Sequence, residues 1–385
     1  MIPISRPFLG DEELEAVQEP LRTGWVVQGP YVAEFEAKVA AFCGVEHAVA
    51  TTSCTTALHV AVSALGLGPG DEVLVPAFTW VSTANVVEQC GARAVFVDVD
   101  LESFNVDAGA LGAAVTDRTV GVIPVHLFGR AADMPGVRAV AERHGLWVLE
   151  DAACALGTRQ DGVHAGGFGD AGCFSFHPRK SITTGEGGML VTGDAQLAAL
   201  ARTLRDHGAS RTDLERHGAP EAFRLAEYAH LGFNYRMTDI QGALGSVQMD
   251  RAAWILGERA RLAARYTEAL ADLGWLRTPR VPDGEDHGWQ AYVCLYAPEE
   301  PTPANAAALG ERRDALMAEL EREGIATRPG THAPVETALY RERHGLREGQ
   351  FPAAHLAERL TLALPLFAGM TDADQDRVVE ALCAG

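Results

Sequence analysis

Short apolar runs rich in β-branched residues alternate with amphipathic helical segments through the first half of this chain. Parallel strands need a helical crossover between them, so this alternation favours a mainly parallel sheet with helices on both faces. The sequence therefore predicts an α/β fold. The expected strands include 72–75, 94–99, 120–125 and 146–149, and the expected helices between them include 57–65, 82–88 and 135–144.

Ligands of such sheets bind beyond the carboxyl ends of the strands. The expected strand 146–149 runs directly into Glu150 and Asp151, and a later apolar run, 172–176, ends shortly before Lys180. A pyridoxal 5′-phosphate (PLP) enzyme needs an amine that binds the cofactor aldehyde and a carboxylate that keeps the ring nitrogen protonated. The two strand ends could supply both groups.

The chain is longer than one ordinary hydrophobic core requires, so we expect a large domain and a smaller one. The segment 208–230 is polar and is predicted as a loop, and 236–273 is predicted as one continuous helical region. Mixed strand and helix signals follow. We place the large domain, with the N-terminal segment, at 1–249 and a smaller α+β domain at 250–385.

The formal net charge of −20 argues against nucleic acid or an anionic membrane as a partner, because either would need a basic surface. The seven cysteines contain no CxxC pair, so we interpret them as reduced thiols, with disulfides or zinc as alternatives, and predict no metal site. The N-terminus lacks a signal-peptide pattern, and no apolar run reaches about 18 residues. We expect a soluble, cytoplasmic protein.

Seven blocks follow one another along the chain: GWVVQGPYVAEFE, TTSCTTALHVAVSALGLGPGDEVLVPAFTWVSTANVV, VFVDVD, VHLFG, EDAACALG, CFSFHPRKSITTGEGGM and FNYRMTDIQGALG. In this order they resemble one known family, the DegT/DnrJ/EryC1/StrS PLP-dependent sugar aminotransferases, which have the aspartate aminotransferase fold (fold type I). The resemblance covers nearly the full length, and only the blocks together are specific. It implies a seven-stranded, mainly parallel sheet between helices and PLP as the cofactor.

The resemblance assigns the two catalytic residues. Lys180 would form the Schiff base with PLP and, once a substrate amine displaces it, move a proton between the substrate carbon and the cofactor. Asp151 would pair with the ring nitrogen. The structural alternatives are a solvated loop lysine for Lys180 and a helix N-cap for Asp151.

Phosphate binding is the second expected function of the site. The resemblance assigns it to Ser53, Thr55 and Thr56 at a helix start, where free backbone amides face an anion, and to the hydroxyl of Ser175. A Ser/Thr-rich helix start is by itself more often a cap. Cys54 stands where the family usually has glycine, which leaves the loop conformation open.

Two further positions would contact the cofactor ring. Trp80 resembles the family aromatic residue that stacks on the pyridine face, and core packing is its alternative. Cys154 stands where the family commonly has a glutamine that contacts the phenolic oxygen. A thiol is shorter and a weaker donor, so Cys154 would make a poorer contact, or a water or another side chain would replace it.

Asn234 resembles the family asparagine that reaches the phosphate of the neighbouring subunit, and a helix cap is its alternative. That role would make the protein a homodimer with shared active sites. His126, His177 and His332 are candidate substrate-side groups, although a lone histidine is more often structural.

The expected function is transfer of an amino group from an amino acid, L-glutamate or L-glutamine, to a nucleotide-linked keto-sugar. A cyclitol ketone is the alternative acceptor. A non-catalytic regulatory relative would not need both Lys180 and Asp151. A PLP sugar dehydratase of this family would carry histidine in place of Lys180. The sequence therefore predicts a transaminase of amino sugar biosynthesis.

Overall fold

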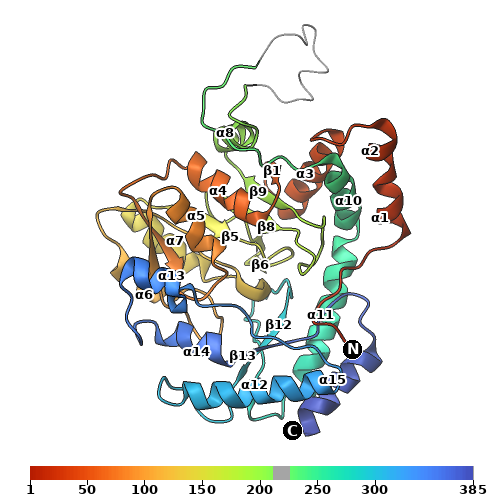
Figure 1. The fold of residues 1–385 in the computed structure, drawn as a ribbon, viewed down its shortest axis with the longest axis vertical. Helices are drawn as coiled ribbons and strands as arrows, with labels where there is room; N and C mark the ends of the chain where they lie inside the picture. The colour runs from red at the N-terminus through yellow and green to blue at the C-terminus, as the bar shows by residue number, and fades with distance from the viewer. Residues whose placement is uncertain (211–225, 385) are drawn as a thin grey trace.

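A seven-stranded sheet forms the centre of the computed structural model, which describes residues 1–210 and 226–384 (Figure 1). Strand β9 runs antiparallel to both of its neighbours, and the other adjacent pairs are parallel. The predicted mainly parallel α/β sheet is confirmed. In spatial order the strands are β1 (His47–Thr51), β9 (Gly188–Thr192), β8 (Ala171–Ser175), β5 (Trp147–Asp151), β4 (Thr119–Val122), β2 (Glu72–Pro76) and β3 (Arg93–Val97).

Both faces of this sheet are buried under helices, which is why its strands are apolar without alternation. Val73 and Val75 of β2 enter one core, whereas Leu74 between them enters the core on the opposite face. The first face is covered by α4 (Cys54–Ala64), α5 (Ser82–Gln89) and α8 (Ala195–Arg205), and the second by α3 (Pro30–Cys43), α6 (Ala108–Ala114), α7 (Met134–His144) and α10 (Asp239–Asp250).

The predicted single helix at 236–273 is wrong, because two helices occupy this region. Helix α10 begins after Thr238, whose side chain forms a capping box with Gln241, and it ends at Asp250. Helix α11 (Ala252–Ala269) then continues toward the C-terminal region. The two helices meet at Arg251, where the sequence has no glycine or proline, so the apolar pattern continues through the junction. The predicted boundary between 249 and 250 falls in the last turn of α10 and stays a prediction.

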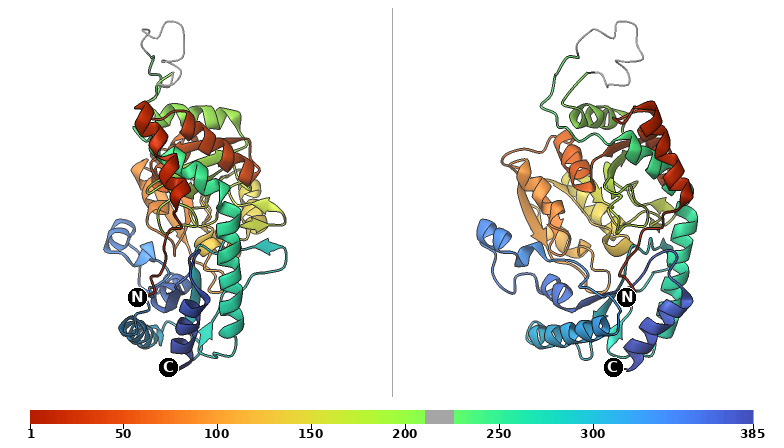
Figure 2. Two further views of the ribbon diagram at one scale, coloured as in Figure 1. Left: turned by 90° about the vertical axis from the view of Figure 1, so that its right-hand side faces the viewer. Right: turned by 45° about the vertical axis from the view of Figure 1, so that its right-hand side comes forward.

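The C-terminal region contains a three-stranded sheet with helices beside it (Figure 2). Ile2, at the chain start, bridges to Ile325 and packs in this region's core. The strands are β10 (Leu276–Arg277), β12 (Tyr292–Tyr296) and β13 (Thr361–Leu364), and the helices are α12 (Ala306–Arg322), α13 (Ala338–His344), α14 (Pro352–Leu360) and α15 (Asp372–Ala384). Two short N-terminal helices, α1 (Asp11–Ala16) and α2 (Gln18–Thr23), lie beside α10.

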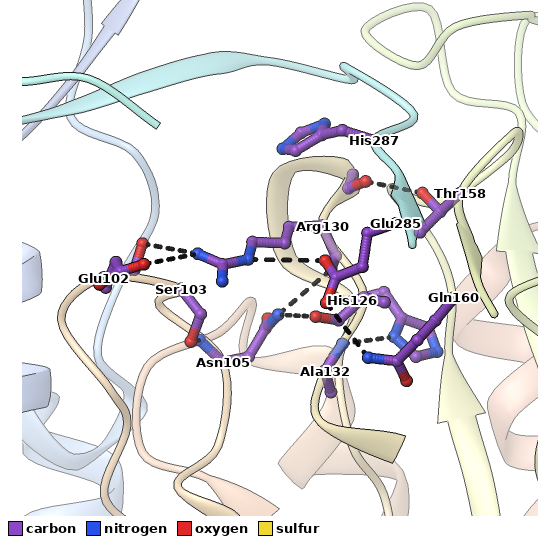
Figure 3. Close-up of polar contacts among 12 residues, drawn as sticks. Glu102, Ser103, Asn105, His126, Arg130, Ala132, Thr158, Gln160, Glu285 and His287 are labelled. Carbon is purple, nitrogen blue, oxygen red and sulfur yellow. Dashed lines mark hydrogen bonds and ion pairs between the residues drawn. The ribbon is translucent and has the colours of Figure 1, made fainter. Parts of the chain in front are cut away.

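A second small sheet joins the two regions. Strand β11 (Glu285–Asp286) pairs with β6 (Arg159–Gln160), which pairs with β7 (Val163–His164). Figure 3 shows Arg130 between Glu102 and Glu285, with Gln160 bonded to the same Glu285 carboxylate.

Within the described residues, no helix is both long and apolar enough to cross a membrane. All seven cysteines are free thiols. The predicted loop 208–230 lies mostly outside the described residues.

Candidate active site

A cavity of about 410 Å³ opens at the carboxyl ends of β5 and β8. It brings together residues that the sequence scatters over more than 120 positions, because the parallel strands end at the same edge of the sheet. Eight of the predicted site residues line it: Ser53, Thr55, Trp80, Asp151, Cys154, Ser175, His177 and Lys180.

Asp151 ends strand β5 and is only 5% exposed. The Thr83 hydroxyl donates to one of its oxygens at 2.7 Å, and the backbone N–H of Ala153 donates to the other at 3.2 Å. Burial raises the pKa of Asp151, and the two hydrogen bonds and the charge of Lys180 offset only part of this shift. A buried carboxylate of this kind is well placed to bind a cationic ring nitrogen. Thr83 lies 68 positions from Asp151 and was not predicted as a site residue.

Lys180 lies in the turn that follows β8 and is half-buried, with its amine pointing to Cys154. Its Nζ donates to Cys154 Sγ at 3.0 Å. Burial lowers the pKa of Lys180, but the contact with Cys154 and the charge of Asp151 raise it by more, so the net shift is upward.

Lysine is rare in this chain, and this is a signal that motif reasoning missed. The sequence contains two lysines, Lys38 and Lys180. Lys38 lies on α3 and pairs with Glu34 at 2.9 Å and Asp250 at 2.7 Å. Lys180 is therefore the one side-chain amine that can reach a ligand in the cavity.

The start of helix α4 forms the second end of the cavity. Ser53 caps this helix, so the amides of its first turn face the cavity with the positive end of the helix dipole. A Cβ at Gly188 would come within 2.2 Å of the Ser53 carbonyl, so only glycine lets β9 pass this close. Cys54 is helical and buried, and its thiol donates to the Cys173 carbonyl at 3.5 Å. Its β-carbon is therefore accommodated in the core.

Thr56 does not line the cavity, and its predicted contact with phosphate stays a prediction. Its hydroxyl is part of the helix cap, where it accepts from the Ser53 N–H at 2.9 Å and donates to the Ser53 carbonyl at 2.8 Å. Thr55, one residue earlier, points its hydroxyl to Ser82 at 2.9 Å and lines the cavity.

His126 is fully buried and does not line the cavity, so its predicted contact with substrate is wrong. Its Nδ1 accepts from the Ala132 N–H at 3.0 Å, as Figure 3 shows, so its Nε2 donates to Glu150 at 2.8 Å. The Glu150 carboxylate also accepts three backbone N–H groups, from Gly166, Phe168 and Gly169. His126 is a structural residue that supports β5.

Replacement of Glu150 is expected to show this structural role. Glu150→Ala leaves the buried His126 donor and three backbone N–H groups without an acceptor, and should lower the free energy of unfolding by about 3–5 kcal/mol. Glu142→Ala, at an exposed pair with Arg138, should change it by less than about 0.5 kcal/mol. Urea unfolding followed by circular dichroism measures both, and equal stability of the two variants would contradict the assignment.

The remaining predicted residues lie around the cavity. His177 lines it and is half-buried, and burial lowers the pKa of its imidazole. Trp80 is 55% exposed and lies beside His332, with ring centroids 5.7 Å apart. His332 and the exposed Asn234 do not line this cavity, so the substrate role of His332 and the partner-subunit role of Asn234 stay predictions.

These groups fit PLP: a helix start for the phosphate, an aromatic side chain at the opening, a buried carboxylate and a single reachable amine. The fold and the site therefore define a PLP-dependent transferase of the aminotransferase fold.

The comparison with family models gives the narrower assignment. The chain belongs to the DegT/DnrJ/EryC1/StrS aminotransferase family, whose model matches residues 7–383. The chain is therefore an aminotransferase enzyme with PLP as its cofactor.

Known relatives match over almost the whole chain. The spore coat polysaccharide biosynthesis protein SpsC of Bacillus subtilis (strain 168) is 40% identical over 99% of this chain and 96% of its own length. The aminotransferase TlmJ from Streptoalloteichus hindustanus is 31% identical, covers 100% of this chain and 98% of its own, and superposes with a TM-score of 0.89. Spr1654 from Streptococcus pneumoniae, in its PLP-form, is 26% identical with a TM-score of 0.89, over 98% of this chain and 97% of its own.

Proposed function

We propose that this enzyme transfers an amino group from an amino acid, L-glutamate or L-glutamine, to a nucleotide-linked keto-sugar. The observation that carries the proposal is the convergence of Asp151 and the only cavity lysine, Lys180, at one edge of the sheet. When bound, PLP supplies an aldehyde that condenses with amines and a ring that takes up electrons from the substrate carbon.

The chain's own residues divide the work around that cofactor. Lys180 Nζ holds the cofactor and then carries the proton between substrate and cofactor carbons. Asp151 keeps the ring nitrogen protonated, and the Thr83 hydrogen bond holds its carboxylate in position. Trp80 covers the ring face and limits the access of water.

Phosphate is held at the other end of the cavity. The amides at the start of α4, with the hydroxyls of Ser53, Thr55 and Ser175, bind it. Cys154 accepts the hydrogen bond of Lys180, so it would contribute chiefly by orienting that amine toward the cofactor.

The keto-sugar assignment is supported by family membership and by SpsC, a polysaccharide biosynthesis protein. A cyclitol ketone is the alternative acceptor. A panel of nucleotide-linked keto-sugars and cyclitol ketones, each offered with L-glutamate and with L-glutamine, should give an aminated product for a nucleotide-linked sugar. Amination of cyclitol ketones alone would contradict the proposal.

We also propose that the enzyme is a homodimer in which Asn234 reaches the partner's phosphate site. Asn234 is exposed and lies outside the cavity of its own chain. Asn234→Ala should therefore weaken PLP binding, although it leaves the chain's own cavity intact.

Mixed dimers test this sharing. Lys180→Ala and Asn234→Ala proteins, each nearly inactive, should regain about a quarter of wild-type activity after subunit exchange, because half the dimers then hold one intact site. If each chain completes its own site, mixing will restore nothing beyond the sum of the separate activities.

A further inference from the structure

Two arginines line the cavity without taking part in cofactor binding. Arg179 precedes Lys180 in the chain, and Arg328 comes from the C-terminal region. Among the described residues neither guanidinium has a hydrogen-bond acceptor or a carboxylate partner, and Glu186, another cavity residue, is ion-paired with neither. Unpaired guanidinium groups that converge in a cavity form a site for an anion.

Both arginines are anchored through their backbones. The Gln290 side-chain amide donates to the Arg179 carbonyl at 2.9 Å. Gln290 is held in turn by Arg259, a 2%-exposed side chain of α11 that donates to the carbonyls of Trp289 and Gln290. The Arg328 carbonyl accepts from the N–H of Ala363 on β13 at 2.8 Å. The two cations therefore approach the cavity from opposite parts of the chain on fixed backbone.

Their exposure orders them along the cavity. Arg328 is half-buried, whereas Arg179 is exposed at the opening. An amino donor must place its α-carbon deepest, next to Lys180, so its α-carboxylate lies deeper than its side chain. The planar guanidinium of arginine matches the two oxygens of a carboxylate. Burial lowers the pKa of the Arg328 guanidinium, and the nearby charge of Arg179 adds to this shift.

We propose that Arg328 binds the α-carboxylate of the amino donor and that Arg179 binds its side-chain carboxylate, so that the enzyme selects L-glutamate over L-glutamine. The inference rests on the proposed aminotransferase function and names the residues that choose the donor. A nucleotide diphosphate is the alternative ligand for the pair. In a nucleotide-linked sugar the sugar ring separates the diphosphate from the reacting carbon. The diphosphate would therefore lie farther from Lys180 than the α-carboxylate of an amino donor, so it fits the half-buried Arg328 less well.

The donor half-reaction tests this assignment on the holoenzyme, with no acceptor present. Loss of the visible absorbance of bound PLP is recorded against L-glutamate and L-glutamine concentration. Arg179→Gln should lower the apparent affinity for L-glutamate about 10- to 100-fold and leave the apparent affinity for L-glutamine nearly unchanged. Arg328→Gln should lower the apparent affinity for both donors by similar factors, and Arg328→Lys should recover part of the lost affinity. Arg277→Gln, at an exposed pair with Glu300, is the matched control and should change neither donor.

Binding of a ligand that cannot react gives a second readout. Glutarate carries two carboxylates and no amine, and butyrate carries one carboxylate. Calorimetry should show that glutarate binds the wild-type holoenzyme and that Arg179→Gln lowers its affinity about 10-fold or more, to that of butyrate.

Three results would overturn the assignment: equal use of both donors by the wild type, equal loss of both donors in Arg179→Gln, or arginine variants that affect only the keto-sugar half-reaction. The last would assign the pair to the acceptor's phosphates. Failure of the proposed function would look different from failure of this assignment. The donor would then still abolish the visible absorbance of bound PLP, but no ketone in the panel would become aminated.

Discussion

Lys180→Ala is expected to abolish transamination, with a loss of at least about 10⁴-fold in kcat. The chain has no second amine within the cavity, because its other lysine, Lys38, is held at the surface of α3 by Glu34 and Asp250. The variant should still bind PLP through the helix α4 start and Asp151, but without a covalent link. Its visible spectrum should therefore be that of the free aldehyde.

Lys38→Ala is the matched control and should keep full activity and the wild-type spectrum. Steady-state turnover with L-glutamate and the best acceptor from the panel measures both variants. Turnover above one per cent of wild type in Lys180→Ala would mean that another group carries the cofactor and moves the proton.

Asp151→Asn should lower kcat about 10²–10³-fold while PLP remains bound. Asparagine keeps the size of the side chain: its carbonyl oxygen can accept from the Ala153 N–H, and its NH2 group can donate to the Thr83 hydroxyl, so the cavity should keep its shape. It lacks the negative charge that holds a proton on the ring nitrogen, so the ring takes up electrons less well.

Thr83→Val separates positioning from charge. The substitution removes one hydrogen bond but leaves the carboxylate, so it should lower kcat by about tenfold or less. Single-turnover kinetics with L-glutamate measure the rate of the donor half-reaction directly in both variants. Wild-type rates in Asp151→Asn would show that the carboxylate does not set the protonation of the ring.

The strand ends and the residues just beyond them could be predicted from the sequence. Asp151 and Lys180 each follow an apolar run by a few positions, and the sheet then brings their ends together. Ser53, Thr55 and Ser175 line the same cavity for the same local reason.

Long-range contacts could not be predicted in this way. Thr83 reaches Asp151 across 68 positions, and nothing in the sequence of its helix marks it as a site residue. His126 follows a strand, as a site residue would, but its ring points into the core because Ala132 and Glu150 supply its partners. Thr56 is one position from Thr55, and helix geometry turns its hydroxyl to the cap.

The arginine pair belongs to the same class. Arg179 and Arg328 are 149 positions apart, and only the approach of the C-terminal region brings them to one cavity. Isolated arginines are mostly surface residues, so their pairing becomes visible only in three dimensions.

Lys180 alone is expected to carry the cofactor. The most direct measurement is borohydride reduction of the PLP-loaded protein, followed by proteolysis and mass spectrometry of the lysine-containing peptides. We expect one pyridoxyl group per chain, on Lys180, and unmodified Lys38. Modification of Lys38, or no modification of Lys180 in the PLP-loaded protein, would contradict it.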